Sequence, residues 1–445
     1  MKKMRLLLLL ILLTSCTFTS QKSSESAQKT EESEVEKIGE VQPESQRLDL
    51  LAESDEIVNY NELAKKLAGL SVDQNFLKDP VYLRYKKTFD AFWAKLSRES
   101  FSLISAWVVQ NIHPLAREVD TIFYPFGGPD VTYVINFFPN ASRYILVGLD
   151  GTGSFDKINE RMQDTQAIPH LEATIHTYIR GGYFITVEML KHLSSRALSG
   201  TLHLILLQLA RLNFKILKIE NISIDKSGRE VPACANSAKS IKIVCEKIDS
   251  KTNQKSQKTF YYVSLDLSNT NPKVSWLEKF VNTNPFCTFI KSASYALHDP
   301  GLFNIKNFIL KNTQFVLQDD TGIPFRNFNK SWKKHAFGAY TNPTLAVFKA
   351  YKQSDLEEFF ANADSVKIPF KIGYGYNLCR PNLILAVPKV SRMPADIAVI
   401  SDINAVKKII TPEAFCDSCG ENNKDDIILK VLENSAIAYN GFFQT

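Results

Sequence analysis

Carboxylates and glycines at the ends of short apolar runs are the residues of this chain best placed to do chemistry. They are Gly127, Gly128 and Asp130 after residues 121–126, Asp150 after residues 144–148, Asp266 near the end of residues 260–267, and the pair Asp319 and Asp320 after residues 314–317. If these runs are parallel strands, their carboxyl ends meet at one edge of a sheet, where open α/β folds bind ligands. Carboxylates beside glycine backbone can bind a ligand or polarise a water molecule. Aspartate is also a favoured turn residue, so each loop alone has a purely structural explanation.

Asp319 and Asp320, together with His298, are the candidates for catalysis. Adjacent carboxylates repel each other, so one of them keeps its proton to a higher pH and can serve as a general acid. The triplet 320–322 matches that of aspartic proteases, which need two such aspartates, and residues 150–153 contain one residue too many to supply the second. No set of nucleophile, base and orienting group is recognisable. A hydrolase acting at this acidic edge is therefore the alternative function.

The sequence predicts no metal site and no cofactor. Glu188 and His192 lie one helical turn apart and are a possible metal pair, but no HExxH motif is present. His203 lies in an almost wholly apolar run, where a core histidine with satisfied hydrogen bonds is the expected explanation. Cys416 and Cys419 form a CxxC without a second ligand pair nearby.

A basic and aromatic segment follows the Asp319-Asp320 loop. Its basic residues are Arg326, Lys330, Lys333 and Lys334, and they interleave with Phe325, Phe328 and Trp332. Such a patch suits anionic glycans, lipid headgroups or phosphate. An exposed loop with two or three aromatic side chains turned inward is the structural alternative.

The first sixteen residues have the pattern of an export signal. Lys2, Lys3 and Arg5 precede the apolar run 6–13, and small residues come just before Cys16. The pattern resembles the bacterial lipoprotein signal, in which the peptide is cleaved before the cysteine and the cysteine carries lipid. An ordinary cleaved signal peptide with an incidental cysteine is the alternative. We therefore expect a lipid anchor at Cys16, which would hold the protein on a membrane of the bacterial envelope, at its periplasmic face or at the cell surface.

Composition divides the rest of the chain. Residues 17–48 are rich in Ser, Glu, Lys and Gln and predict a disordered tether. Residues 49–390 predict an α/β body, in which the lysine-rich residues 225–258 predict a surface insertion, and residues 391–445 form a C-terminal extension with the CxxC. Six cysteines remain after Cys16, an even number that in an exported protein favours disulfides. Cys234 and Cys245 flank a plausible hairpin, although the sequence leaves all pairings open.

Helical and strand patterns alternate through the body. Helices are predicted at 61–70, 87–112, 131–138, 158–180, 184–194, 201–212, 274–281, 286–297 and 305–310, and strands at 121–126, 144–148, 214–224, 260–267, 314–317, 366–376 and 382–390. The alternation predicts a doubly wound, mostly parallel (Rossmann-like) sheet with an antiparallel C-terminal edge made by the last two strands. The order resembles the core of Rossmann-like methyltransferases, with a glycine turn after the first strand, Asp150 after the second, and a closing hairpin.

Several short motifs resemble those of an uncharacterised family of exported bacterial proteins. They are YPFGGPD (124–130), FFP (137–139), SLDLSN (264–269), SASYALH (292–298), QDDTGIPF (318–325) and IGYGY (372–376). The resemblance covers roughly residues 87–390. It implies one continuous domain and supplies no catalytic residues and no ligand.

The charge balance disfavours nucleic acid as a partner. The formal net charge of +6 includes the signal peptide, and removing its three positive side chains leaves about +3, a small excess for a chain of this length. We expect a lipid-anchored protein that binds an unknown ligand or protein partner through the acidic edge and the basic-aromatic segment. Besides the hydrolase, a methyltransferase-type fold without a working cofactor is a second alternative.

Overall fold

The computed structural model describes residues 60–71, 73–153, 200–234, 239–248, 253–374 and 381–389, together with Ile168, Leu171, Glu172 and Ile175. The predicted signal, Cys16, the tether, the C-terminal extension, the predicted helix 184–194 and most of the predicted helix 158–180 lie outside the described residues. No helix among the described residues is long and apolar enough to cross a membrane.

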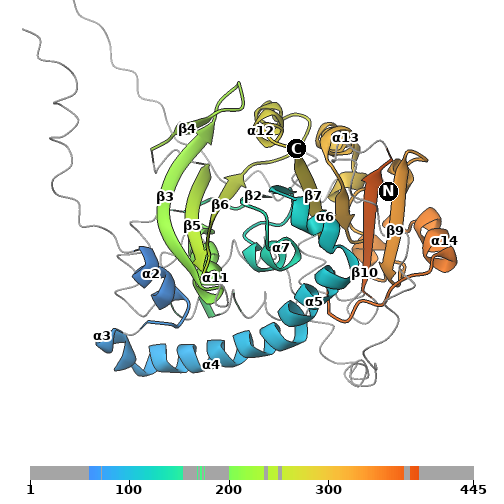
Figure 1. Cartoon of the computed structure of the whole chain (residues 1–445). Helices are drawn as coiled ribbons and strands as arrows, with labels where there is room; N and C mark the ends of the chain where they lie inside the picture. The colour runs from blue at the N-terminus through green and yellow to red at the C-terminus, as the bar shows by residue number, and fades with distance from the viewer. Residues whose placement is uncertain are drawn as a thin grey trace, which may run out of the picture. The chain divides into compact units, whose positions relative to one another are not determined.

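Five parallel strands form the centre of a ten-stranded sheet (Figure 1). They lie side by side in the order β6 (Lys255–Ser264), β2 (Arg143–Gly148), β1 (Thr121–Tyr124), β7 (Phe286–Ile290) and β8 (Val316–Gln318). Every residue of β1, β7 and β8 is buried, as expected for parallel strands covered on both faces. The order of the strands reverses between β1 and β7.

Antiparallel strands extend this centre on both sides. Next to β6 lie β5 (Ser240–Ile248), β3 (Phe214–Ile224) and the short β4 (Glu230–Pro232), and next to β8 lie β10 (Asn382–Pro388) and β9 (Trp332–Gly338). Five of the nine strand pairings are antiparallel, and four are parallel. The sheet is therefore mixed, and the prediction of a mostly parallel sheet is wrong.

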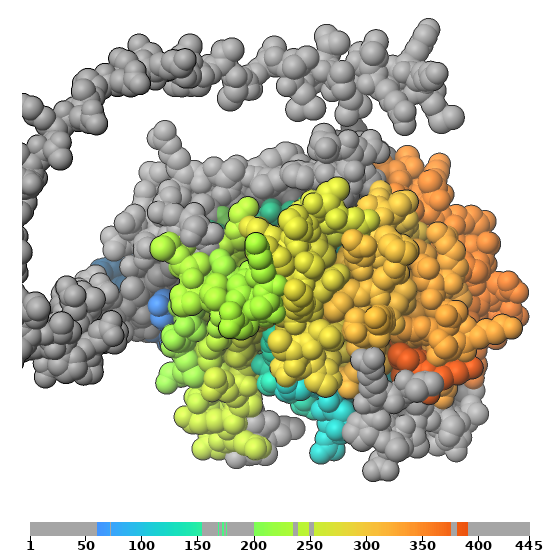
Figure 2. Space-filling model, turned by 90° about the horizontal axis from the view of Figure 1, so that it is seen from above, coloured from blue at the N-terminus to red at the C-terminus, as the bar shows by residue number. Residues whose placement is uncertain are grey.

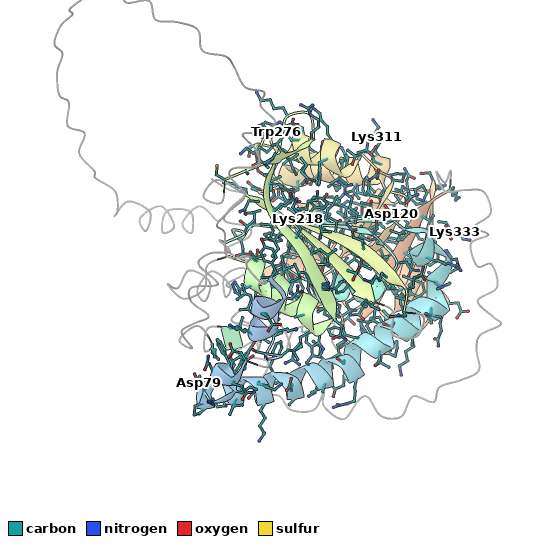
Figure 3. All side chains as sticks on the ribbon, turned by 60° about the vertical axis from the view of Figure 1, so that its left-hand side comes forward. Asp79, Asp120, Lys218, Trp276, Lys311 and Lys333 are labelled. Carbon is teal, nitrogen blue, oxygen red and sulfur yellow. The ribbon has the colours of Figure 1, made fainter. Side chains whose placement is uncertain are left out.

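Helices cover both faces of the sheet, and each face has its own apolar core. On one face lie α2 (Tyr60–Leu67), α4 (Pro80–Leu96), α5 (Ser102–Asn111), α6 (His113–Glu118), α7 (Val131–Phe137) and α11 (Leu202–Arg211). On the other lie α12 (Val274–Val281), α13 (Phe303–Asn312) and α14 (Ser354–Asn362). Figure 3 places Asp79, which caps α4, on one side, and Trp276 of α12 and Lys311 of α13 on the other. Segments from β3 onward, coloured green to orange, form most of the face that Figure 2 shows.

The period of the apolar residues explains the helices that the sequence predicts well. The helix over Val274–Val281 is found with the predicted bounds, and α11 and α13 differ from prediction by two residues at most at either end. The predicted helix 87–112 begins earlier, at Pro80, because Asp79 accepts a hydrogen bond from the Val81 N–H and caps it. It passes through a π-helical turn, Ser97–Phe101, into α5. The short α3 (Gln74–Leu77) precedes it.

Three predicted segments differ from the structure. The run Phe286–Ile290, predicted as the start of a helix, is strand β7, because it is inserted between β1 and β8 and buried on both faces. Residues 225–258 are not a surface insertion, because β5 lies inside the sheet with Ile241, Ile243 and Cys245 fully buried. The closing antiparallel pair is β10 with β9, whereas Val366 makes only an isolated bridge to Phe337.

Candidate functional site

The predicted acidic loops do leave the sheet at one edge. Because β6, β2, β1, β7 and β8 are parallel, the loops that follow them all start at their carboxyl ends. β8 is parallel to β7, so Asp319 and Asp320 emerge on the same edge as Asp130 and Asp150. The structure thus places the candidate residues on one edge, and the contacts of each decide what it can do there.

The glycine turn after β1 folds back against β2. The Gly128 N–H donates to the Val147 carbonyl at 3.1 Å, and Gly128 has a φ of +55°, a conformation that favours glycine. A Cβ at Gly127 would lie 2.3 Å from the ring of Tyr124, so no larger residue fits there. Gly128 is buried, yet a Cβ built on it would meet no heavy atom of the described residues within 4 Å. Among the described residues, none fills the space beside the turn.

Asp130 forms a buried ion pair at the point where the strand order reverses. Its Oδ2 atom lies 3.0 Å from the Lys291 Nζ atom, and both side chains are 1% exposed. The Tyr124 hydroxyl donates to the same carboxylate, which also caps α7 by accepting the Tyr133 N–H. Burial raises the pKa of Tyr124 well above its usual value, and the charge of Asp130 raises it further. The carboxylate of Asp130 is therefore held by protein groups.

Among the predicted site residues, Asp150 has the carboxylate that lacks a hydrogen-bond partner in the described structure. It follows β2 and is 3% exposed, and no other residue that the structure describes donates a hydrogen bond to Oδ1 or Oδ2. Burial raises the pKa of Asp150 to about 7, because removal from water disfavours the charged form, and its own backbone amide opposes the rise only in part. The backbone of Asp150 is fixed, since its carbonyl accepts the Tyr262 hydroxyl at 2.8 Å. Buried carboxylates without partners are rare in proteins, and such a residue calls for a functional explanation.

Helix α11 fixes the loops on both sides of this carboxylate. At its N-terminal end, the Thr201 and Leu202 N–H groups each donate at 3.0 Å, to the carbonyls of Gly151 and Thr152. Further along the helix, the Gln208 amide donates to the Pro129 carbonyl at 2.7 Å and accepts the Thr132 N–H at 3.2 Å. The loops after β1 and β2 are thus held in a fixed relation.

Asp266 and the Asp319-Asp320 pair are occupied by protein hydrogen bonds. Asp266, half-buried after β6, accepts both the N–H and the hydroxyl of Ser268. Asp319 accepts the Ser292 N–H at 2.8 Å and the Thr321 N–H at 3.0 Å. Asp320 accepts the Tyr295 hydroxyl and the Asn382 amide. Burial raises the pKa of Asp319 to about 7, and the adjacent Asp320 contributes to the rise.

The loop after β7 connects these groups, beginning with Lys291, which the sequence analysis did not single out. Lys291 pairs with Asp130, and the next residue, Ser292, donates to Asp319. Ser292, Ser294 and Tyr295 all have positive φ between 52° and 58°, an uncommon conformation for residues other than glycine. The strained loop is held by Asp319, Thr321 and the Tyr374 hydroxyl. Recognising residues 286–290 as a strand would have placed Lys291 at a strand end and pointed to it.

His298 packs against Tyr295, whose hydroxyl donates to Asp320 of the carboxylate pair that His298 was grouped with. Its ring packs edge-on against Tyr295 and Tyr351, with centroids 5.2 and 5.4 Å away. Burial lowers the pKa of His298 to about 3, and the charges of Arg326 and Lys306 lower it further, with no carboxylate acting in the opposite direction. A histidine that is neutral at every physiological pH and has no acidic partner is poorly suited to act with Asp319 and Asp320.

The aromatic side chains of the basic-aromatic segment are part of the core. Phe325, Phe328 and Trp332 are 8%, 2% and 7% exposed. Lys334 donates to the Phe328 carbonyl, whereas Arg326, Lys330 and Lys333 are exposed. The segment starts β9, an edge strand, where lysines also discourage pairing with another sheet. The aromatic side chains of this segment are therefore turned inward, as the structural alternative expects.

The described part of the chain holds free thiols and no metal-binding cluster. Cys245 and Cys287 are free thiols, both fully buried, so no disulfide joins Cys234 to Cys245, and the expected disulfides are not found among the described cysteines. A buried cysteine serves as a small apolar residue. Cys379, Cys416, Cys419, Glu188 and His192 lie outside the described residues. Within them, no group of three or more His, Cys, Asp or Glu side chains is arranged to hold a metal ion.

Comparisons with known proteins bring no further assignment. No family model, no curated protein and no solved structure matches this chain.

Proposed function

We propose that this protein binds a small molecule carrying neighbouring hydroxyl groups, such as a ribonucleoside, at the carboxyl edge of β1, β2 and β6. The observation that carries the proposal is the buried Asp150 carboxylate, to which no described residue donates. A carboxylate accepts two hydrogen bonds from a pair of hydroxyls with good geometry. The acidic residue after the second strand of a dinucleotide-binding fold binds the hydroxyls of ribose in this way.

The strand arrangement supports a doubly wound, Rossmann-like centre. The five parallel strands lie in the order β6-β2-β1-β7-β8, with helices on both faces. In the dinucleotide-binding fold, too, the first strand is central and the strand order reverses beside it. The antiparallel β10 and β9 close the sheet in the manner of Rossmann-like methyltransferases. The position of Asp150 after β2 is the one where such folds contact a nucleoside.

Two glycines of the neighbouring turns indicate room for a ligand near Asp150. A Cβ on Gly128 or on Gly151 would meet no heavy atom of the described residues within 4 Å. By contrast, a Cβ on Gly148 would lie 2.7 Å from the Tyr262 hydroxyl and 3.0 Å from the Gly128 Cα atom. The strand end is therefore tightly packed, and the open positions are the two glycines of the turns.

Binding is favoured over hydrolysis by the state of the other acidic groups. Asp130, Asp319 and Asp320 are all engaged by protein donors, and His298 has no acidic partner. Moreover, the Asp130–Lys291 pair occupies the point of strand reversal, where enzymes of this architecture place reacting groups. We therefore propose a binding module rather than the hydrolase alternative.

The N-terminal sequence supports a place for this module. We propose that Cys16 is lipidated and anchors the body to a membrane of the bacterial envelope. The family resemblance to exported proteins supports the same location.

Calorimetric titration of the mature protein with adenosine, guanosine, cytidine and uridine at pH 8 tests the proposal. Asp150→Asn should weaken the tightest of these complexes at least tenfold, because a hydrogen bond to a charged group is worth about 1.5–3 kcal/mol. Asp266→Asn is the matched control, since Asp266 follows the neighbouring strand but is bonded to Ser268, and it should change the affinity less than twofold. Equal affinities of wild type and Asp150→Asn would overturn the assignment of this site.

Gly151→Ala separates ligand binding from folding. A Cβ at this position meets no described residue, and its φ is not in the left-handed region, so the melting temperature should stay unchanged. The added methyl group should lower the affinity if the ligand lies against the turn.

A further inference from the structure

The backbone of the glycine turn determines which charge the ligand can carry. Folds that bind phosphate after the first strand leave backbone N–H groups of the turn and of the following helix free to point at the anion. The relevant question for this chain is how many of those donors remain available between Gly128 and the first turn of α7.

All of these donors are used within the protein. Three of them bond to backbone carbonyls: Gly128 N–H to Val147, Asp130 N–H to Gly127 and Val131 N–H to Pro129, at 3.1, 3.3 and 2.9 Å. The remaining two bond to side chains, Thr132 N–H to Gln208 and Tyr133 N–H to Asp130, at 3.2 and 3.3 Å. Pro129 has no N–H to offer. No backbone N–H group between Gly128 and Tyr133 is therefore left for a phosphate.

The side chains around the turn also disfavour the binding of an anion. The carboxylate of Asp130 already occupies the N-terminal end of α7, the position that a phosphate would take, and it is 1% exposed. Lys291, the cation at this point of the edge, is 3.0 Å from that carboxylate and lies 4.0 Å from the centroid of the Tyr133 ring. Asp150, two residues beyond Gly148, which packs against Gly128, is a second carboxylate at this edge. An anion placed here would meet negative charge without donors to compensate for its lost hydration.

We infer that the ligand carries no phosphate and is uncharged or positively charged where it meets the glycine turn. The inference rests on the proposed function, because it concerns the ligand of the same site. It excludes mononucleotides and dinucleotides, and it leaves nucleosides and other hydroxyl-bearing molecules without an anionic group.

Three related probes test the inference on the wild-type protein. The ribonucleoside that binds most tightly is compared at pH 8 with its 5′-monophosphate and with its 5′-amino-5′-deoxy analogue. We expect the monophosphate to bind at least tenfold more weakly than the nucleoside, and the amino analogue to bind equally well or better. A monophosphate that binds as tightly as the nucleoside, or more tightly, overturns the inference and leaves the proposed function standing. Failure of all the nucleosides and both derivatives to bind overturns both.

Asp130→Asn adds a test within the turn. Asparagine is also a good helix cap, but it removes the negative charge and leaves Lys291 without its carboxylate partner. The discrimination against the monophosphate should then fall severalfold, whereas unchanged discrimination would contradict the role given to Asp130. Because breaking a buried ion pair is strongly destabilising, the wild-type comparison decides the inference by itself if this variant does not fold.

Discussion

At the scale of single residues, Asp150 stands out because a carboxylate without a partner in a buried position lowers stability. The folded protein keeps Asp150 protonated up to about pH 7, whereas the unfolded chain loses this proton near the ordinary value of 3.8. The charge of Asp150 therefore costs no stability below that pH, and the stability that it costs grows between about pH 4 and 7. A protein that keeps such a residue gains something from it other than stability.

The first prediction follows from this difference. Asp150→Asn should raise the free energy of unfolding at pH 8 by up to about 4 kcal/mol, and the gain should vanish toward pH 4. Urea unfolding of both proteins at pH 4.5 and pH 8 measures it. A gain of the same size at both pH values, or none at either, would show that the carboxylate is not destabilising in the way described.

The acidic residues also show how far sequence reasoning reaches at this scale. The aspartates after β1, β2, β6 and β8 could be predicted to share an edge, because strand ends can be recognised from apolar runs and parallel strands end together. The hydrogen-bond partner of each carboxylate could not be predicted. Asp130 and Asp320 meet side chains from distant segments, Lys291 and Asn382, and such contacts cannot be read from the local sequence.

At the scale of elements, α11 is the helix that holds the site, and it contains a buried histidine. His203 is fully buried, and in the described structure neither ring nitrogen has a hydrogen-bond partner, so the predicted core position is found but its nitrogens are not satisfied. Burial lowers the pKa of His203 from 6.5 to about 3. The folded protein thus keeps the ring neutral where the unfolded chain binds a proton, and stability is lost as the pH falls below about 6.5.

The second prediction concerns this helix. At pH 5, His203→Leu should be more stable than the wild type by about 2 kcal/mol beyond any difference seen at pH 7.5. The leucine removes the proton-binding group and keeps an apolar side chain of similar size. Denaturant titrations at the two pH values measure the effect, and a difference that does not grow on acidification would contradict it.

The elements themselves were predictable to different degrees. Helices with a clear apolar period, such as α12 and α13, could be found from the sequence with small errors. Strand β7 could not, because its five residues are all apolar or small and lack the alternation that marks a half-exposed strand. The partner of β10 was also out of reach, since β9 is a basic, aromatic run whose pairing is fixed by the sheet.

At the scale of the whole molecule, the proposal that Cys16 is lipidated and anchors the body to a membrane can be tested by one substitution. Cys16→Ser should leave an uncleaved, unlipidated precursor, because the lipid is attached to the cysteine thiol. Membrane fractionation and the mass of the N-terminal peptide measure the change. A variant that is processed and fractionates like the wild type would show that Cys16 is not the anchor.

The central claim is that a pair of ligand hydroxyls supplies the hydrogen bonds that Asp150 lacks. The most direct measurement is the affinity of the wild-type protein at pH 8 for the best-binding ribonucleoside and for its 2′-deoxy form, which differ by one hydroxyl. We predict that the deoxy form binds about tenfold more weakly or worse, and that Asp150→Asn abolishes this difference. Equal affinities of the two forms for the wild-type protein would contradict the claim.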